Sequence, residues 1–237
     1  MNSKRRLLAT IIAGGVVSMT GGIFTEETRA EDALPEHGPI VHSGQKVAFL
    51  GASISEFGWT HPGGYIKLFV DTVIANGINI VPIPAGVSGN TSRDMLARLD
   101  KDVISKKPDW MTVDAGGNDV WHGSVDFDEY MANMTQIVER AQKARIHVVL
   151  QTCTPLFEDL NGDFNKKLAY YNQFQRYLAA QKKCVLADLN QASVDILKTK
   201  TGTENILTTD GVHMNDRGNK VMANGLLEAF GLTVRIS

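Results

Sequence analysis

The chain has 237 residues, with 24 Lys and Arg against 26 Asp and Glu and a hydrophobic content of 43%. These values are typical of a single folded domain and exclude a disordered chain or a coiled coil. A net charge of −2, with basic residues clustered only at the N-terminus, argues against a nucleic-acid-binding protein. A chain of this length buries a sufficient core without disulfides or a structural metal.

The N-terminal segment predicts a secretory signal peptide. Lys4, Arg5 and Arg6 precede an uncharged, mostly apolar run over residues 7–17, and small residues lead up to Ala30. The run is too short, and too interrupted by glycines, for a comfortable membrane-spanning helix. We expect residues 1–30 to be cleaved, residues 31–44 to be a linker and residues 45–237 to form the domain. The protein would then be secreted or periplasmic, with no stable membrane insertion; the alternative is an uncleaved anchor.

Short β-rich runs alternate with segments of helical apolar spacing over the rest of the chain. The predicted strands are Val47–Leu50, Ile78–Ile83, Trp110–Asp114, Val148–Gln151 and Val185–Asp188. The predicted helices are Tyr65–Ala75, Thr91–Leu99, Phe127–Ala144, Asn165–Gln181, Gln191–Lys198 and Arg217–Phe230. The strands are apolar on both faces, which is typical of a parallel sheet covered by helices on each side. We therefore predict a three-layer α/β/α sandwich.

Four short motifs carry the polar residues that the chemistry of such a fold requires. They are Gly51-Ala52-Ser53, Ser88-Gly89-Asn90, Gly117-Asn118-Asp119 and Asp210-Gly211-Val212-His213. The first three follow predicted strands, and functional groups in open α/β sheets gather beyond the carboxyl ends of the strands. Each motif alone is weak, because the same residue types commonly form turns. Together they contain every part that acyl transfer needs.

A serine hydroxyl becomes a nucleophile when a base accepts its proton and a third group holds that base in one tautomer. We assign these roles to Ser53, His213 and Asp210. The spacing of Asp210 and His213 lets the carboxylate turn back onto Nδ1 while Nε2 faces Ser53. The backbone N–H groups of Ser53 and Gly89 and the side-chain amide of Asn118 can donate to the oxyanion, and a glycine at position 89 leaves room for the backbone to approach.

These residues resemble the four blocks of the SGNH hydrolases, also called the GDSL esterase and lipase superfamily. The family's Ser, Gly, Asn and His correspond in order to Ser53, Gly89, Asn118 and His213, and the resemblance spans about residues 45–232. It implies a flavodoxin-like, five-stranded parallel sheet in the order 2-1-3-4-5 and cleavage of esters or thioesters without metal or cofactor. The common α/β-hydrolases fit less well, because the sequence around Ser53 lacks their G-x-S-x-G pattern.

Ala52 departs from the family, which has Asp between the glycine and the serine of this block. An Asp there can fix the loop through hydrogen bonds, so its absence could loosen Ser53. Two hypotheses follow. The first is a secreted serine ester hydrolase for short-chain acyl esters, and its preferred substrates would be O-acetyl groups on carbohydrate. A lysophospholipase or thioesterase is the next candidate. The same residues would also serve acyl transfer to a sugar. The second is a catalytically impaired binding protein of the same fold.

Aromatic and histidine side chains follow the first and third motifs at Trp59, His61, Trp121 and His122. They either line the acyl or sugar side of the cleft or pack at its rim. Long insertions that would form a lid are absent from the sequence, and an open, partly polar cleft suits short acyl groups on a polar alcohol. The expected partner is a small-molecule or polysaccharide ester, not a nucleic acid, and the oligomeric state is left open. His213 with nearby oxygens falls short of a zinc site.

Overall fold

The computed structural model describes residues 38–237. The predicted signal peptide and residues 31–37 of the predicted linker lie outside this range. Two residues from the described part of that linker, Ile40 and Val41, are buried. The Ile40 N–H donates to the carbonyl of Phe230 at 3.0 Å. The folded unit therefore includes Ile40 and Val41.

Five parallel strands form one sheet. The strands are β1 (Lys46–Gly51), β2 (Val81–Gly86), β3 (Trp110–Asp114), β4 (His147–Gln151) and β5 (Val185–Ala187). Their order is β2-β1-β3-β4-β5, and every neighbouring pair is parallel. Alternate strand residues enter opposite cores, Ala48 and Leu50 on one side and Val47 and Phe49 on the other. The predicted flavodoxin-like sheet is confirmed.

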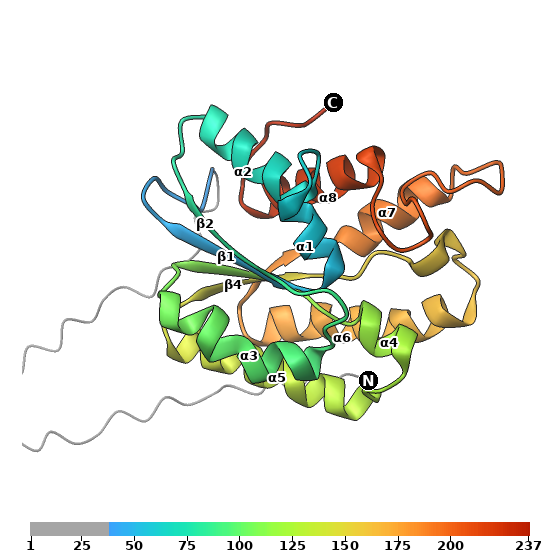
Figure 1. Cartoon of the computed structure of the whole chain (residues 1–237), viewed down its shortest axis with the longest axis horizontal. Coiled ribbons are helices and arrows are strands. Elements are labelled where there is room, and N and C mark those ends of the chain that lie inside the picture. Colours follow the sequence, from blue (N-terminus) through green and yellow to red (C-terminus); the bar gives the residue numbers. More distant parts are fainter. Residues whose placement is uncertain (1–37) are drawn as a thin grey trace, which may run out of the picture. The chain divides into compact units, whose positions relative to one another are not determined.

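Helices cover both faces of the sheet, as the apolar strands predict (Figure 1). One layer contains α1 (Ser53–Thr60), α2 (Tyr65–Ala75), α7 (Leu189–Leu197) and α8 (Asp216–Ala229). The other contains α3 (Ser92–Asp102), α4 (Gly117–His122), α5 (Phe127–Lys143) and α6 (Asp163–Gln181). Two short 3₁₀ turns, η1 (Ile104–Lys106) and η2 (Leu156–Glu158), join these elements. The three-layer α/β/α sandwich is therefore also confirmed.

The largest differences from the prediction concern three elements. The helices α1 and α4 were not predicted, because each is too short to show a helical period and starts close to the end of a strand. β2 begins at Val81 and not at Ile78, because the Ile78 N–H still donates to the Val73 carbonyl in the last turn of α2. β2 tolerates Pro82 and Pro84 because it is an edge strand, where a missing N–H need not break a ladder.

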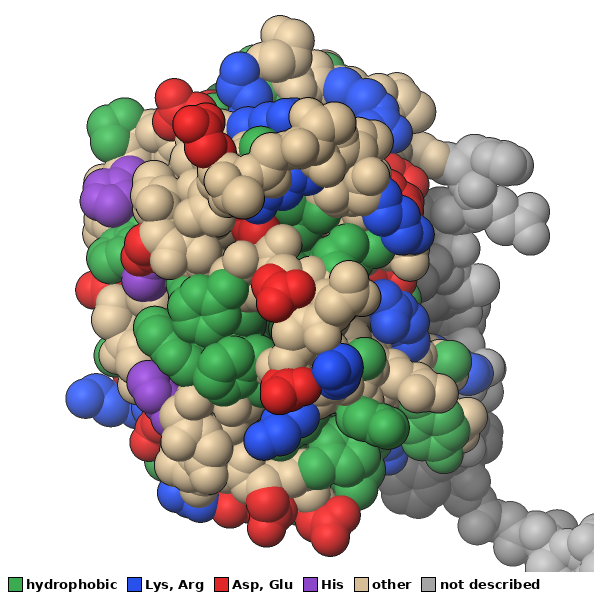
Figure 2. Space-filling model, turned by 90° about the vertical axis from the view of Figure 1, so that its right-hand side faces the viewer, with side chains coloured by type: hydrophobic (Ala, Val, Ile, Leu, Met, Phe, Trp, Pro, Cys, Tyr) green, Lys and Arg blue, Asp and Glu red, His purple; other side chains and the backbone are tan. Residues whose placement is uncertain are grey.

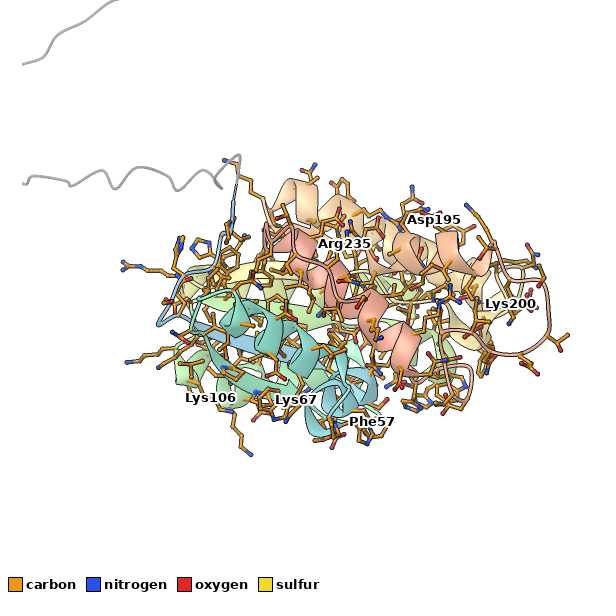
Figure 3. The ribbon with its side chains drawn as sticks, turned by 90° about the horizontal axis from the view of Figure 1, so that it is seen from above. Phe57, Lys67, Lys106, Asp195, Lys200 and Arg235 are labelled. Carbon is orange, nitrogen blue, oxygen red and sulfur yellow. The ribbon has the colours of Figure 1, made fainter. Side chains whose placement is uncertain are left out.

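The parallel strands bring all their carboxyl ends to one edge of the sheet. Figure 3 shows Lys106, which precedes β3, at one end of the molecule, and Lys200, in the segment that leads to Asp210, at the opposite end. The predicted motifs therefore meet at the carboxyl edge. Within residues 38–237, no helix has the length and apolar character needed to cross a membrane.

Candidate active site

Ser53 is the first residue of α1 and is half-buried at the carboxyl end of β1. The turn between them requires Gly51 for space: a Cβ at that position would lie 2.0 Å from the hydroxyl oxygen of Ser55. Gly51 does not have a positive φ, so the glycine is needed here for space and not for its backbone conformation. The start of α1 directs helix N–H groups and the positive end of the helix dipole toward the Ser53 region.

Ser53, His213 and Asp210 form one chain of hydrogen bonds. The Ser53 hydroxyl oxygen lies 2.9 Å from His213 Nε2, and His213 Nδ1 lies 2.7 Å from Asp210 Oδ2. The other Asp210 oxygen, Oδ1, accepts the backbone N–H groups of Val212 at 2.9 Å and of His213 at 2.7 Å. The structure therefore brings together the three residues that the sequence assigned to nucleophile, base and orienting acid.

Burial alone would raise the pKa of Asp210, but the hydrogen bonds from the His213 side chain and from the His213 and Val212 backbone outweigh it and lower the pKa to about 2. Asp210 is therefore ionised at neutral pH. An ionised carboxylate at Nδ1 favours the tautomer with its proton on Nδ1, which leaves Nε2 to accept the Ser53 proton.

Hydrogen bonds join the two ends of the segment that carries His213. The Thr209 N–H donates to the His213 carbonyl at 2.8 Å, and Thr208 pairs with Met214 in an isolated antiparallel bridge. Asn215 then caps α8, its side chain accepting the Gly218 N–H at 3.0 Å. These contacts fix the segment between the end of the loop and the start of the helix, and so hold the imidazole toward Ser53.

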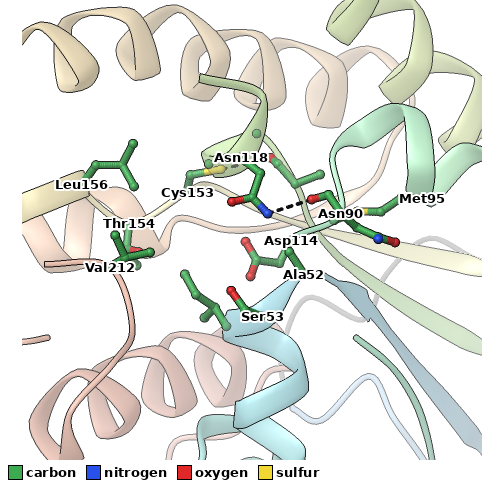
Figure 4. A pocket seen from close by; sticks show the side chains of 14 residues that line it. Ala52, Ser53, Asn90, Met95, Asp114, Asn118, Cys153, Thr154, Leu156 and Val212 are labelled. Atoms are coloured by element: carbon green, nitrogen blue, oxygen red, sulfur yellow. Dashed lines mark hydrogen bonds between the residues drawn. The ribbon is translucent and has the colours of Figure 1, made fainter. Parts of the chain in front are cut away.

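Ser53 and Asn118 line the same pocket, and Figure 4 shows their side chains on opposite sides of it, with Asp114 between them in this view. The Asn118 amide nitrogen donates to the Asn90 carbonyl at 2.9 Å. An amide nitrogen carries two hydrogens, so a second donor remains for a group in the pocket. The start of α4, immediately after β3, holds Asn118 in this position.

Gly89 has a different place from the other predicted oxyanion residues. It lies in an exposed turn with φ +79°, and a Cβ there would meet nothing within 4 Å. The glycine is therefore needed for its left-handed backbone and not for space among the surrounding protein atoms. Gly89 does not line the Ser53 pocket, whereas the next residue, Asn90, does.

Two charged residues that the sequence analysis did not single out connect the motifs. Glu56 of α1 accepts the Ser88 N–H at 2.8 Å and also the Ser88 hydroxyl. Arg98 of α3 donates to the Asn90 side chain at 2.6 Å and to the Gly51 carbonyl at 2.9 Å. Both sit on amphipathic helices, where charged residues are common, so nothing in the local sequence distinguishes them from ordinary surface residues.

Ala52 stands at the N-cap of α1 and provides no side-chain cap. Its methyl group packs on the core between the sheet and the α3–α5 layer. The turn is held through Gly51 instead, by the hydrogen bond from Arg98. Apolar packing and a distant guanidinium therefore support the Ser53 loop where the family has an aspartate.

Asp114, at the end of β3, is a buried acid in the same pocket. It accepts the Ser55 hydroxyl at 3.3 Å, and Ser55 also shares a hydrogen bond of 2.9 Å with the Tyr65 hydroxyl. Burial raises the pKa of Asp114 to about 6, although the hydrogen bond from Ser55 acts in the opposite direction. Asp114 is therefore a titratable group close to Ser53 that does not belong to the hydrogen-bonded chain of Asp210.

The four rim residues separate into two groups. Trp59 packs against the α2–α8 core with Lys67 Nζ 5.5 Å from its ring centre, and so fits the packing alternative. The His61 ring lies 5.0 Å from that of Phe57, and both line a hollow beside His213. The rings of Trp121 and His122 stack on each other near the end of α4, with their centres 5.4 Å apart.

Within residues 38–237, no group of three or more His, Cys, Asp or Glu side chains is arranged to hold a metal ion.

Known proteins of similar sequence include two esterases. The acetylxylan esterase of Geobacillus stearothermophilus is 27% identical over 212 residues, which are 81% of this chain and 96% of the relative. The esterase TesA of Pseudomonas aeruginosa is 26% identical over 173 residues, which are 71% of this chain and 79% of the relative.

A solved structure of a variant of the acetyl xylan esterase Axe2 from Geobacillus stearothermophilus is 28% identical and superposes with a TM-score of 0.76. The match covers 83% of this chain and 99% of that chain. Other structures of Axe2 are of catalytic mutants, in which a serine, an aspartate or a histidine is replaced by alanine.

The GDSL-like lipase/acylhydrolase family matches residues 49–221, a range that contains all four motifs. The chain therefore belongs to this family, the SGNH hydrolases that its motifs resemble, and is a carboxylic ester hydrolase.

Proposed function

We propose that the protein is a secreted hydrolase of short-chain acyl esters, with O-acetyl groups on carbohydrate as the preferred substrates. Its catalytic residues are Ser53, His213 and Asp210. The observation that carries the proposal is the continuous chain of contacts from Asp210 through His213 to Ser53, beside a pocket that Asn118 also lines. The name of the acetylxylan esterase relative supports acetyl as the acyl group, and the residues replaced in the catalytic mutants of Axe2 are of the same three types, serine, aspartate and histidine.

Acylation uses these residues in a fixed order. His213 Nε2 accepts the Ser53 proton while the Ser53 oxygen bonds to the acyl carbonyl carbon. The oxyanion that forms accepts hydrogen bonds from the Ser53 N–H and from the Asn118 amide. Gly89, the third donor that the sequence suggests, lies in an exposed turn outside this pocket. His213 then donates its proton to the alcohol oxygen, the carbon–oxygen bond breaks, and the alcohol leaves with the acyl group bound to Ser53.

Deacylation repeats the sequence with water. His213 accepts one proton from water while the water oxygen bonds to the acyl carbon, and the Ser53 N–H and the Asn118 amide again hold the oxyanion. The bond to Ser53 breaks, the proton returns to the Ser53 oxygen, and the carboxylic acid leaves. Ionised Asp210 stabilises the imidazolium that forms in each half of the reaction.

The expected preference for short acyl groups can be tested by acyl-chain length. Ser53, Leu156 and Val212 line one pocket, and side chains this close to the reacting carbon restrict the space for a long acyl group. We expect kcat/KM to fall steadily from acetyl to longer chains in a series of 4-nitrophenyl esters, in which only the acyl group changes. An optimum at about eight carbons or more would contradict the assignment and favour a lysophospholipase or thioesterase.

Export is proposed from the N-terminal sequence, which lies outside the described residues. The basic start, the apolar run and the small residues before the expected cleavage site support it. When the full chain is produced in a bacterial host, N-terminal sequencing of the exported protein should begin at Glu31. Protein that keeps Met1 and sediments with membranes would show the uncleaved anchor instead.

A further inference from the structure

Three exposed aromatic side chains gather near the carboxyl edge of the sheet. Trp121, Phe157 and Phe164 are 38%, 38% and 39% exposed. Ring centres lie 5.7 Å apart for Trp121 and Phe157, and 5.6 Å apart for Phe157 and Phe164. We call these three residues the aromatic platform. Figure 2 shows hydrophobic side chains gathered near the middle of one face, with histidine side chains beside them. Exposed apolar clusters of this kind mark binding surfaces in soluble proteins.

The aromatic platform adjoins the pocket that contains Ser53. Trp121 lies about one turn after Asn118 on α4, so one short helix supplies a residue to the pocket and a residue to the platform. Leu156, which lines the pocket, directly precedes Phe157 in η2. The platform therefore borders the pocket on the side of Leu156.

Phe157 is held at the surface by an unfavourable backbone. Phe157 has φ 56° and ψ 14°, and the next residue, Glu158, has φ 50°. Such conformations cost of order 1 kcal/mol or more each for residues other than glycine, and persist where the surrounding structure enforces them. The Phe157 N–H donates to the Gly211 carbonyl at 2.6 Å. A Cβ on Gly211 would lie only 2.8 Å from the Phe157 ring, so the ring rests on the peptide between Asp210 and His213.

Glu158 fixes the other side of the same turn. Glu158 is 7% exposed, and its carboxylate accepts the N–H groups of Ile206 at 2.8 Å, Leu207 at 2.7 Å and Thr208 at 2.8 Å. The Thr208 hydroxyl, at 2.8 Å, and Lys200 Nζ, at 3.2 Å, complete its contacts. Residues 206–208 lead directly to the loop that carries the proposed base. Phe157 points outward and Glu158 inward, so the position of the platform is tied to that of the loop.

The chemistry of the alcohol identifies what the platform can bind. His213 returns its proton to the alcohol oxygen, so the alcohol part of the ester must lie on the side of His213. A pyranose ring has an apolar C–H face, which packs on flat aromatic rings, and polar hydroxyl groups at its edge, which remain in water. A long acyl chain would need an enclosed apolar channel, whereas these rings are open to solvent and have exposed Asp210 and His122 nearby.

We propose that the aromatic platform is the subsite for the sugar ring that carries the acetyl group. The inference rests on the proposed function and specifies how that function selects its alcohol. It assigns the binding of the sugar to Trp121 and Phe157, with Phe164 extending the surface.

The test compares two esters that share the acetyl group, β-D-xylopyranose tetraacetate and ethyl acetate. In Trp121→Leu and Phe157→Leu, which keep an apolar side chain and remove the flat ring, the ratio of kcat/KM for the sugar acetate to that for ethyl acetate should fall about tenfold. The loss should be mainly in KM for the sugar acetate. Trp121→Phe should restore most of the ratio, because it keeps a ring. Tyr177→Leu is the matched control, since Tyr177 is an exposed aromatic residue in the last turns of α6, and it should retain the wild-type ratio.

Several outcomes would overturn the inference. An unchanged ratio in both leucine variants would show that the rings do not contact the sugar. An equal loss on both esters would show that the rings only hold the loop of His213. A selective loss on ethyl octanoate would assign the platform to the acyl chain. If the wild-type protein hydrolyses neither acetate ester, the proposed function fails and the inference with it. If the wild type hydrolyses both esters and the leucine variants keep its ratio, only the inference is contradicted.

Discussion

Replacing either Ser53 or His213 with alanine should lower kcat for 4-nitrophenyl acetate by about 10⁴- to 10⁶-fold, and the double variant should be scarcely worse than either. The physical reason is that the hydroxyl and the imidazole act as one unit: without the base the nucleophile keeps its proton, and without the nucleophile the base has nothing to activate. Asp210→Asn should cost about 10⁴-fold or less, because His213 remains but loses the carboxylate that selects its tautomer.

Two controls separate chemistry from folding in this experiment. Ser105→Ala removes an exposed hydroxyl that donates to the Lys101 carbonyl, in the η1 turn that precedes the amino end of β3, and should leave kcat unchanged. A fluorophosphonate probe should label the wild type and the Ser105 variant but not Ser53→Ala. A folded wild-type protein that neither reacts with the probe nor hydrolyses the ester would contradict the assignment of Ser53. That result would favour the impaired binding protein instead.

The sequence predicted most residues of the candidate site because its motifs are local and a parallel sheet collects strand ends at one edge. Asp210 and His213 are close enough in the chain for a single loop to bring their side chains together. In the structure Asp210 Oδ2 lies 2.7 Å from His213 Nδ1. Ser53 is 160 positions from His213 in the chain, yet it needs only to follow the interior strand β1 to reach the same edge. The sheet order thus converts four weak local signals into one cluster.

Other features of the site depend on contacts between distant elements and have no local signature. Arg98 joins the turns after β1 and β2, but along α3 it is one charged residue among several. Ala52 suggested a loosened loop, whereas the structure shows its methyl group packed and the turn held from outside. The role of a missing side chain cannot be deduced until its spatial neighbours are known.

The aromatic platform also contains a residue that the sequence alone does not distinguish. Trp121 was noted as a residue of the rim, but Phe157 was not singled out, because phenylalanine favours buried, right-handed or extended positions. Its left-handed backbone follows from the contacts of Glu158 with residues 206–208 and from the hydrogen bond to Gly211. These partners are about 50 residues away in the chain.

Asp114 gives the second large effect that we expect, on stability. Burial raises its pKa from an ordinary value of 3.8 to about 6 in the folded protein. Between these two values the folded state binds more protons than the unfolded state, so the free energy of unfolding falls as the pH rises. The fall is complete above about pH 6, where the carboxylate is charged in both states, and a shift of about two units corresponds to about 3 kcal/mol.

Asp114→Asn removes this titration and can still accept a hydrogen bond from Ser55. The free energy of unfolding of the variant, relative to that of the wild type, should therefore be up to about 3 kcal/mol more favourable at pH 7 than at pH 4. Urea denaturation at the two pH values measures this difference, and groups that titrate equally in both proteins cancel. The same relative stability at both pH values would show that Asp114 does not hold its proton up to about pH 6.

Ser55→Ala provides a control in which the pH dependence of stability should increase instead of disappearing. The Ser55 hydroxyl donates to Asp114 and partly offsets the effect of burial on its pKa. Without this hydrogen bond the pKa of Asp114 should rise further, and the fall in stability should extend to higher pH than in the wild type. In the double variant Ser55→Ala, Asp114→Asn the extension should disappear, because the group that titrates is gone. If it remained, the pH dependence would belong to a group other than Asp114.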